Sequence, residues 1–420
     1  MNSLLLLMGL LLVAYLGSSL ASGERSVGGV GLPSSVEWVV LGVVIGPQAL
    51  GVVSSSVIEN VQSIVLVALS WLMLTFGVHY GVTSTGRVSI GRAVVAIVNA
   101  IVTAGAVFAA VYFLVPRVAP ELAKDKLSLA LGIAAVSCET TRHVMRWVRE
   151  RHGARGPLVD LLEDVASAED LVPIALVVAL FVLEAKSKIA WLGPPAVSGV
   201  TVGLGVGLGA LAALLLGREF RLRESWGTVF GISLLAIGVS AMVGLAYVAV
   251  CFILGATLVL ASRHAGEIRA MLGPTERGAL LPILIVCGVR IEPQNLIHTA
   301  EIFAIVFAAR ALSKVILARL VVGSRERVSG LVGLGMMSSG ALSMCLALTC
   351  AMTFRGSVGS TILVVAAALA VVGELVGPPS LRASLKRAGE LHPVEVARDA
   401  DSPSPPESEE SREDAKETAS

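Results

Sequence analysis

The sequence predicts an all-α polytopic membrane protein of about 13 transmembrane helices, with two discontinuous helices that meet near the membrane midplane. Three observations predict this class. Of the 420 residues, 55% are hydrophobic and only 15% are charged, whereas soluble domains carry about 25% charged residues. Apolar segments of roughly 17–25 residues recur along the chain, which is the length that spans a bilayer. Two of these segments are interrupted by small and polar residues.

The apolar segments give the order of the spans. The first has the length of a signal peptide, and SLAS near Ala21 resembles a cleavage site. Because no Lys or Arg precedes Arg25, the basic start of a signal peptide is missing, and we expect this span to be retained. The spans are expected near residues 3–20, 34–51, 60–82, 91–116, 127–148, 157–184, 190–216, 226–241, 243–261, 275–291, 297–322, 328–353 and 358–381.

Basic residues indicate which side of the membrane each loop faces. If the N-terminus lies outside, nearly every inner loop contains Arg or Lys, and the outer loops contain fewer. The positive-inside rule therefore favours a multi-pass protein of the plasma or inner membrane with a cytoplasmic C-terminus. The outer basic residues would be Arg117, Lys124, Lys126, Lys186, Lys188, Arg290 and Arg355.

The chain is expected to consist of a membrane transporter domain, residues 1–385, and a cytoplasmic tail, residues 386–420. The tail is rich in Ser, Pro and Glu and has little to bury, so it is expected to be disordered. The glycine-rich run at residues 199–217 lacks the strand and the Lys-Ser/Thr ending of a phosphate-binding loop. Its glycines, spaced four apart, indicate close helix packing instead.

Little in the sequence points to an enzyme. The five cysteines lie in apolar segments without CxxC or Cys/His spacing, and the histidines show no ligand spacing. His143 follows Arg142 and is interpreted as an inner-surface residue or, alternatively, a pH sensor. No cofactor and no nucleic-acid partner are expected.

Two adjacent acids, Glu169 and Asp170, lie within the apolar stretch LLEDVASAEDLVPIALVVALFVL. An ionised carboxylate in a membrane helix costs about 2.5–3.5 kcal/mol or more, so such acids face a partner or a hydrated cavity. Asp160, Glu163 and Asp170 share one helical face, because their spacings follow the helical repeat. That face is predicted to line an acidic cytoplasmic funnel for cations that ends at Asp170. The alternative is an acid satisfied by a neighbouring helix.

A buried amine is the candidate partner of the acids. Arg310 and Lys314 lie one turn apart within one span, IFAIVFAARALSKVILARLVVG. A buried Lys is stabilised by a carboxylate and gives up its proton more readily when that carboxylate is neutralised. Lys314 is therefore predicted to be a salt-bridge partner and proton carrier. The sequence leaves open whether it pairs with Glu169, Asp170 or neither.

The two interrupted spans complete the pattern. GIAAVSCETTRHVMRW breaks at Glu139 and Thr140, and GLVGLGMMSSGALSMCLAL breaks near Ser338. In transporters, paired interruptions in corresponding positions of two halves mark unwound helices that meet at a binding site.

These segments resemble the monovalent cation/proton antiporter superfamily over residues 34–382. The resemblance rests on VLGVVIGPQALGVV, ALGIAAVSCETTRHVMRWVRE, VASAEDLVPIALV, LLPILIVCGVRIEP, RALSKVILARLVVG and GLGMMSSGALSMCLAL. It implies exchange of a monovalent cation, most simply Na⁺, for H⁺ by alternating access. Asp170 matches the essential cation- and proton-binding aspartate. Glu169 and Lys314 match the acid and lysine that are paired in electrogenic members.

The resemblance also implies a core of inverted repeats whose two discontinuous helices cross at the midplane, a division of the membrane domain, and a homodimer in the lipid bilayer. Core helices are expected at 91–184 and 297–381, dimerisation and scaffold helices at 3–82 and 226–291, and a linker helix at 190–216. The cation- and proton-binding residues would be Asp170, which is the Na⁺ ligand, with Glu169, Thr140, Glu139 and Ser338.

The sequence departs from the family pattern at both interruptions. Glu139-Thr140-Thr141 stands where the family has Thr-Asp-Pro or Thr-Ser-Pro, and Met337 to Ala341 replaces Ser-Pro-Arg-Gly-Glu. These changes leave three alternatives: a K⁺/H⁺ antiporter, a non-transporting sensor on the same fold, and a symporter of organic anions. Retention of Asp170 and Lys314 argues against the sensor, and the acidic face argues against the symporter.

Overall fold

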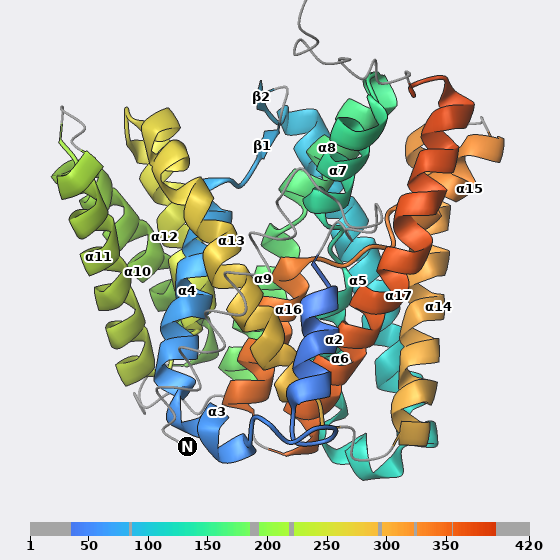
Figure 1. Ribbon diagram of the computed structural model, residues 1–420, viewed down its shortest axis with the longest axis horizontal. Coiled ribbons are helices and arrows are strands. Elements are labelled where there is room, and N and C mark those ends of the chain that lie inside the picture. The colour runs from blue at the N-terminus through green and yellow to red at the C-terminus, as the bar shows by residue number, and fades with distance from the viewer. Residues whose placement is uncertain are drawn as a thin grey trace, which may run out of the picture.

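The computed structural model describes residues 35–83, 86–184, 193–217, 222–292, 296–322, 326–354 and 356–391. The described chain is almost entirely helical (Figure 1). A short hairpin of β1 (Val82–Thr83) and β2 (Gly86–Arg87) is the one sheet within these residues. The predicted first span and the tail beyond residue 391 lie outside them. Every later predicted span corresponds to one helix or to a pair of helices.

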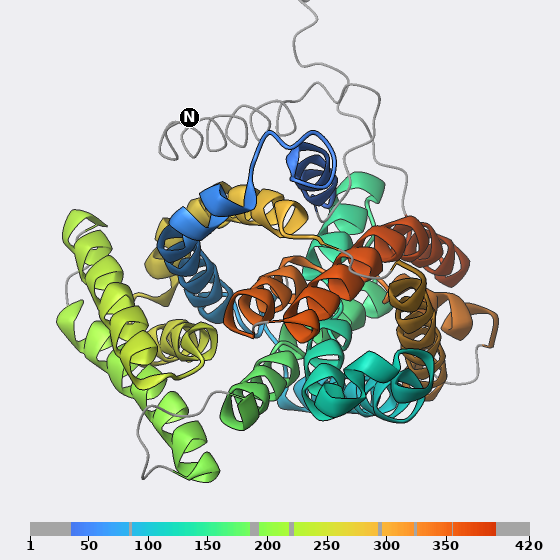
Figure 2. The same ribbon diagram turned by 90° about the horizontal axis from the view of Figure 1, so that it is seen from below.

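The helices form two groups that lie side by side (Figures 1 and 2). One group packs around α4 and α12, with α2 against α13. The other packs around α5, α6 and α17. The first group comprises α2 (Glu37–Ile45), α3 (Ser55–Asn60), α4 (Gln62–Val78), α10 (Pro194–Leu215), α11 (Leu222–Val243), α12 (Tyr247–Ala261) and α13 (Ala265–Val289).

The second group contains the interrupted helices and the candidate site. Its elements are α5 (Ile90–Val118), the 3₁₀ turn η1 (Pro120–Asp125), α6 (Lys126–Ser137), α7 (Arg142–His152), α8 (Pro157–Ala168), α9 (Leu171–Glu184), α14 (Leu296–Val322), α15 (Glu326–Gly335), α16 (Ala341–Thr353) and α17 (Ser357–Ala388).

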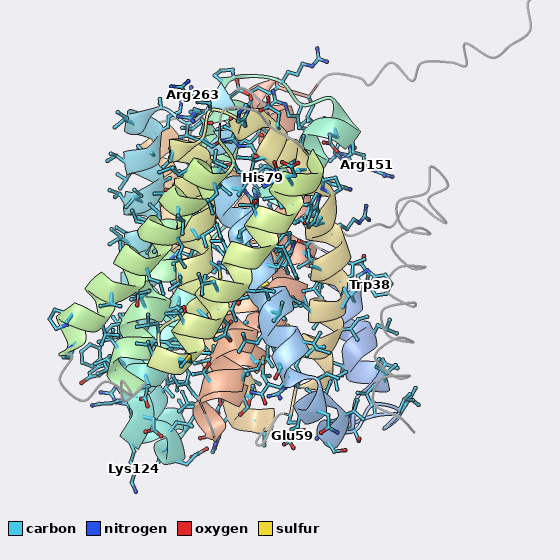
Figure 3. All side chains as sticks on the ribbon, turned by 90° about the vertical axis from the view of Figure 1, so that its left-hand side faces the viewer. Trp38, Glu59, His79, Lys124, Arg151 and Arg263 are labelled. Carbon is cyan, nitrogen blue, oxygen red and sulfur yellow. The ribbon has the colours of Figure 1, made fainter. Side chains whose placement is uncertain are left out.

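The outside of the molecule suits a bilayer. Among the described residues, six helices are long and apolar enough to cross a membrane. Large apolar side chains such as Phe113, Leu214 and Met242 are exposed on the outer helices, where lipid would cover them. Charged groups gather toward the two ends, with Arg151 and Arg263 at one end and Glu59 and Lys124 at the other (Figure 3). The chain is a multi-pass membrane protein.

The glycine-rich helix α10 packs closely on α12, as its sequence predicts. A Cβ atom at Gly205 would lie 2.8 Å from Ile253, and one at Gly209 would lie 2.7 Å from the Leu254 carbonyl oxygen. Nothing lies close to Gly203 or Gly207. The pair Gly205 and Gly209 therefore contributes to helix packing, whereas the pair Gly203 and Gly207 does not do so within the described residues.

Both predicted interruptions are present. The first separates α6 from α7 at residues 138–141, and the second separates α15 from α16 at residues 336–340. The predicted span over 157–184 is present and contains a turn, because α8 ends at Ala168 and α9 begins at Leu171. Pro173 has no N–H to donate to the Glu169 carbonyl, which instead accepts from Val172 at 3.1 Å. The two acids therefore occupy a turn.

Helical structure continues past residue 386, where the tail was predicted to begin. Helix α17 continues to Ala388 and ends at Gly389, which has a left-handed conformation with φ of 77°. Glu390 then reaches the start of α8, where its carboxylate accepts from the N–H groups of Leu158 and Val159, both at 2.9 Å. A carboxylate stabilises the N-terminus of a helix, so this contact fixes the end of α17 to α8.

Candidate cation site

The two interrupted helices touch where their helices stop. The Thr141 N–H donates to the Ser338 carbonyl oxygen at 3.0 Å. Gly340 approaches the first interruption closely, because a Cβ there would overlap the Thr141 side chain. Any larger residue at 340 would push the two interruptions apart. The crossing brings together two helix N-termini and two helix C-termini.

Charged side chains satisfy the helix ends at this crossing. The Glu139 carboxylate accepts from the N–H groups of Gly340 at 2.8 Å and Ser343 at 3.2 Å, at the N-terminus of α16. Lys314 donates to the Cys138 carbonyl oxygen at 3.1 Å, at the C-terminal end of α6. Glu139 therefore lies at the positive end of the α16 dipole, and Lys314 lies at the negative end of the α6 dipole.

Arg310 ties the two interruptions together. It is fully buried, and its guanidinium donates to the Glu139 carbonyl oxygen at 2.6 Å and the Ser338 carbonyl oxygen at 3.5 Å, and to the Ser339 hydroxyl. No role for Arg310 was predicted from the sequence. Its position one turn before Lys314 in an apolar span was the available signal.

Glu169 is completely buried and surrounded by donors. Its Oε1 accepts from the Thr140 N–H. Its Oε2 accepts from the Asn99 side-chain amide at 3.0 Å and lies 3.4 Å from the Lys314 Nζ. Both members of the ion pair have no exposed surface. The geometry thus pairs Lys314 with Glu169, a choice that the sequence left open. Asn99 was missed, because one Asn in an apolar helix carries no signal of its partner.

Asp170 has a different environment from its neighbour. Its residue is 6% exposed and lines a cavity of about 20 Å³ together with Glu139 and Thr140. Such a volume holds about one water molecule. Within the described chain, the Asp170 carboxylate accepts no hydrogen bond and forms no salt bridge. The remaining lining residues are Phe76, Thr141, Arg142, His143, Ala341 and Leu342.

Two predicted hydroxyl ligands lie in different places. Thr140 lines the cavity, and its Oγ1 accepts from Lys314 at 2.8 Å. Ser338 does not line it, because its hydroxyl donates to the Gly373 carbonyl oxygen at 3.1 Å on α17. Thr140 therefore touches both the ion pair and the cavity.

The acids of the predicted funnel lie on α8, where they share a basic partner. Arg149 lies 3.3 Å from Asp160 and 2.6 Å from Glu163. One turn away, Asp164 pairs with Arg92 at 2.6 Å. In this conformation the acidic face is therefore covered by arginines. Its role as a cation funnel remains a prediction.

The Asp170 cavity lies between the two helix groups, because Phe76 comes from α4 and the other lining residues come from the second group. His143 on α7 lies 3.5 Å from the Glu276 carboxylate on α13. Arg142 lies over the ring of Phe76 and donates to the His79 carbonyl oxygen at 3.4 Å. His143 is partly buried and lines the cavity, and its interpretation as an inner-surface residue or a pH sensor stays a prediction.

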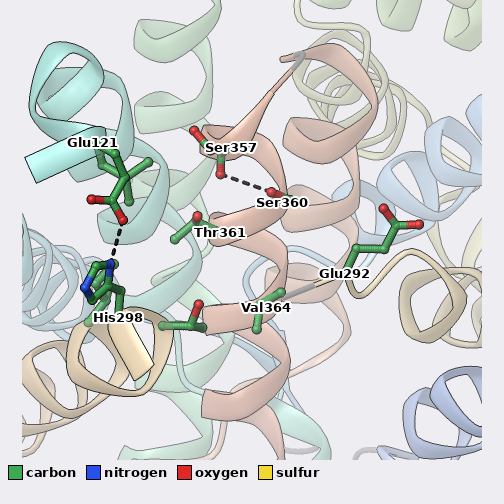
Figure 4. Close-up of a pocket in the computed structure, with 10 residues that line it drawn as sticks. Glu121, Glu292, His298, Ser357, Ser360, Thr361 and Val364 are labelled. Atoms are coloured by element: carbon green, nitrogen blue, oxygen red, sulfur yellow. Dashed lines mark hydrogen bonds and ion pairs between the residues drawn. The ribbon is translucent and has the colours of Figure 1, made fainter. Parts of the chain in front are cut away.

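A second cavity of about 40 Å³ lies between η1, the start of α14 and the start of α17 (Figure 4). It is lined by Glu121 of η1, His298 of α14 and the hydroxyls of Ser357 and Ser360 on α17. The Glu121 carboxylate lies 2.6 Å from the His298 ring. The pKa of this carboxyl is held below its usual value. The hydrogen bond from the Glu121 backbone N–H has the larger effect, and the hydrogen bond with His298 has the next largest.

Comparison with known proteins places the chain in a family. The family described as "Sodium/hydrogen exchanger, transmembrane" matches residues 10–383. The chain belongs to this family. Its resemblance to the cation/proton antiporters is thereby confirmed, and its relatives are transporters rather than enzymes. No curated protein matches the sequence significantly.

Solved structures share the fold of this family member. The structure of the sodium proton antiporter MjNhaP1 from Methanocaldococcus jannaschii at pH 8 matches with a TM-score of 0.66 and 16% identity, over 92% of this chain and 99% of that one. A second MjNhaP1 structure, from a three-dimensional electron microscopy map, matches with a TM-score of 0.63 and 16% identity, over 94% and 100% of the two chains. The predicted fold class is confirmed.

Proposed function

We propose that this chain exchanges Na⁺ for H⁺ across the membrane and that the two ions compete for Asp170. The observation that carries the proposal is the contrast between two buried acids. Asp170 faces a cavity without a hydrogen-bond partner in the described chain, whereas Glu169 is fully engaged. A carboxylate in a small polar cavity between two interrupted helices is a suitable site for either a proton or a bare cation.

The cavity offers oxygen ligands to the cation. Asp170 and Glu139 supply carboxylates, and Thr140 supplies a hydroxyl. Hard monovalent and divalent cations prefer such oxygen ligands. A proton on Asp170 removes the negative charge that would hold the cation. Binding of one ion therefore releases the other.

Exchange rather than leak follows from the cost of an empty site. With neither ion bound, the ionised Asp170 would lie in a small buried cavity without a direct ion-pair partner in the described chain. Moving that charge between the two sides of the membrane is costly, whereas the loaded site is neutralised. The Lys314–Glu169 pair balances its own charges. Electrogenic exchange would require Lys314 to release its proton as well.

Alternating access would involve movement of the core helices against the scaffold helices in a homodimer. An apolar cluster spans the two helix groups, and polar contacts also join them. Tyr80, after α4, donates to the Ala168 carbonyl oxygen at 3.1 Å, and the His143–Glu276 contact joins α7 to α13. We place the protein in the plasma or inner membrane with the N-terminus outside. Arg151 and Arg263 at one end of the molecule support this orientation.

The test is dissipation of a pH gradient in proteoliposomes when Na⁺, Li⁺ or K⁺ is added. Wild-type protein should respond to Na⁺, and Asp170→Asn should lose the response completely. A response to K⁺ alone would replace the cation in this proposal. Silence with every cation from correctly folded and inserted protein would contradict cation/proton exchange and favour a sensor.

A further inference from the structure

Arg142 begins α7 beside the Asp170 cavity, at a position that is unfavourable for a cation. Its N-cap residue is Thr141, so Arg142 lies at the positive end of the α7 dipole. The basic residues in the last turn of α7, by contrast, lie where the dipole favours them. Helix stability therefore does not account for a guanidinium at position 142, and its surroundings have to be considered.

Helix α4 of the first group holds the Arg142 guanidinium at the edge of the cavity. The guanidinium donates to the His79 carbonyl oxygen at 3.4 Å, at the C-terminal end of α4. Its central carbon lies 5.4 Å from the centre of the Phe76 ring. A cation is favoured both at the negative end of a helix dipole and over an aromatic face. These contacts keep the guanidinium beside the Asp170 carboxylate without an ion pair between the two.

Arg142 nevertheless acts on the cavity through its charge. It lines the cavity together with Asp170 and Glu139, and it interacts electrostatically with Asp170 and with Glu276, which lies outside the lining. The remaining titratable lining residue is His143, which lies 3.5 Å from Glu276. Charges that are partly buried are screened less by salt than charges on the surface. The guanidinium therefore opposes the entry of a cation into the cavity.

The charges of the lining residues match a monovalent cation. Asp170 and Glu139 supply two carboxylates, and Arg142 supplies the one guanidinium among the described residues that line the cavity. Two carboxylates without a compensating charge would suit a divalent cation, because Ca²⁺ sites are built from several carboxylate and carbonyl oxygens. With the guanidinium present and both carboxylates ionised, one net negative charge remains for the bound cation to neutralise.

We propose that Arg142 is a specificity-determining residue, whose positive charge excludes divalent cations from the Asp170 cavity and so restricts exchange to monovalent ones. This proposal rests on the proposed function. Arg142 acts through its charge and does not coordinate the transported ion. Because the Coulomb energy scales with the product of the two charges, the repulsion is twice as large for a divalent cation as for Na⁺. Removal of Arg142 should therefore tighten divalent binding by the square of the factor for Na⁺.

The test is Na⁺-driven exchange in proteoliposomes with Ca²⁺ added as a competitor at constant ionic strength. Ca²⁺ is the probe because it accepts flexible oxygen coordination, whereas Mg²⁺ gives up its water reluctantly. In Arg142→Gln, the half-saturating Na⁺ concentration should fall by about tenfold relative to wild type. The Ca²⁺ concentration that halves exchange should fall by about a hundredfold, with Na⁺ held at the half-saturating concentration of each variant.

Two control variants separate the charge from its position. Arg146→Gln removes the same charge one turn further along α7, from an exposed residue that does not line the cavity. Both concentrations should stay within about twofold of wild type in this variant, because water and salt screen an exposed charge. Arg142→Lys keeps the charge at the cavity and should also stay close to wild type in both measurements.

Different failures have different meanings. Absence of exchange in the wild type would contradict the proposed function itself. Slower exchange in Arg142→Gln with both concentrations unchanged would make Arg142 a link between the helix groups and would overturn the proposal. A fall by the same factor for Na⁺ and Ca²⁺ would indicate a change in the shape of the cavity, rather than in its charge, and would also overturn it.

A second measurement covers variants that bind ions without transporting them. Proton release in weakly buffered detergent solution should occur in Arg142→Gln at about a hundredfold lower Ca²⁺ concentration than in wild type. The double variant Arg142→Gln/Asp170→Asn should release no protons, which would assign the Ca²⁺ to the same cavity. Release that persists in the double variant would contradict the proposal.

The wild type alone provides a test that needs no folded variant. Ca²⁺ should release protons from the wild type only at concentrations well above those at which Na⁺ does so, because the guanidinium repels the divalent ion more strongly. Ca²⁺ that is as effective as Na⁺ in the wild type would contradict the exclusion of divalent cations by Arg142.

Discussion

Glu169 and Asp170 are adjacent in the chain but occupy opposite kinds of environment. Glu169 is enclosed by Asn99, Thr140 and Lys314, whereas Asp170 faces a cavity with room for about one water molecule. The turn forced by Pro173 allows the two side chains to point apart. Two adjacent acids at a turn between membrane helices can therefore have separate environments, one enclosed by partners and one facing a cavity.

The two environments make different demands on a substitution. A buried ion pair is weak evidence for stability as a whole, but removal of one partner leaves an uncompensated charge. Changes around Glu169 should therefore be seen first in folding. Asp170 lacks such partners in the described chain, so changes around it should be seen first in transport.

The largest expected effect is on the Glu169 side. Lys314→Ala should lower the free energy of unfolding by about 3–5 kcal/mol, because Glu169 would remain buried without its counter-charge. Thermal unfolding of the purified protein in detergent measures this effect. The control is Glu169→Gln/Lys314→Gln, which removes both charges and should recover most of the loss. A loss in the double variant as large as in the single one would show that the pair is not a unit.

Arg310 supports the surroundings of both Glu169 and Asp170, because it holds the two interruptions together. Arg310→Ala should cost about 2–4 kcal/mol, since the Glu139 and Ser338 carbonyl oxygens would lose a charged donor. Arg319→Ala, at an exposed position further along α14, should change stability by less than about 0.5 kcal/mol. Equal melting temperatures for the two variants would remove Arg310 from this role.

Glu139 should affect the Asp170 side more than the fold. In Glu139→Gln the side-chain oxygen can still accept from Gly340 and Ser343, so the N-terminus of α16 keeps its cap. The cavity would lose one of its two carboxylates. The half-saturating Na⁺ concentration should rise by about tenfold, equivalent to about 1.4 kcal/mol. Unchanged Na⁺ dependence in proteoliposomes would place Glu139 outside the cation site.

The smallest expected effect is at the far end of α8, which leads to both acids. Glu390→Ala should lower the free energy of unfolding by about 1 kcal/mol through loss of the helix cap. Deletion of residues 392–420 is the matched comparison and should leave the melting temperature unchanged, because it retains Glu390. A larger loss from the deletion than from Glu390→Ala would assign the stabilising contact to the tail.

Much of the fold could be predicted from apolar segment length and from breaks in it. The interruptions around Thr140 and Ser338 were found because polar and glycine residues stand out in apolar helices. The turn at Glu169 was missed, although Pro173 was a signal for it. The identities of the buried charges were also predictable, since Asp170, Glu169 and Lys314 are costly in lipid without a function.

The partners of these charges could not be predicted, because they depend on packing between helices that are distant in sequence. Asn99 meets Glu169 only when α5 packs beside α8 and the first interruption. Glu390 meets α8 only when the end of α17 turns back at Gly389. Sequence spacing describes one helix face, and it says little about which face of another helix lies opposite.

The central claim is that Asp170, and not Glu169, exchanges its proton for the cation. The direct measurement is proton release on addition of Na⁺ to detergent-solubilised protein in weakly buffered solution, followed with a pH-sensitive dye. Wild type and Glu169→Gln/Lys314→Gln should both release protons, and Asp170→Asn should release none. Release that persists in Asp170→Asn but disappears in the double variant would contradict the claim.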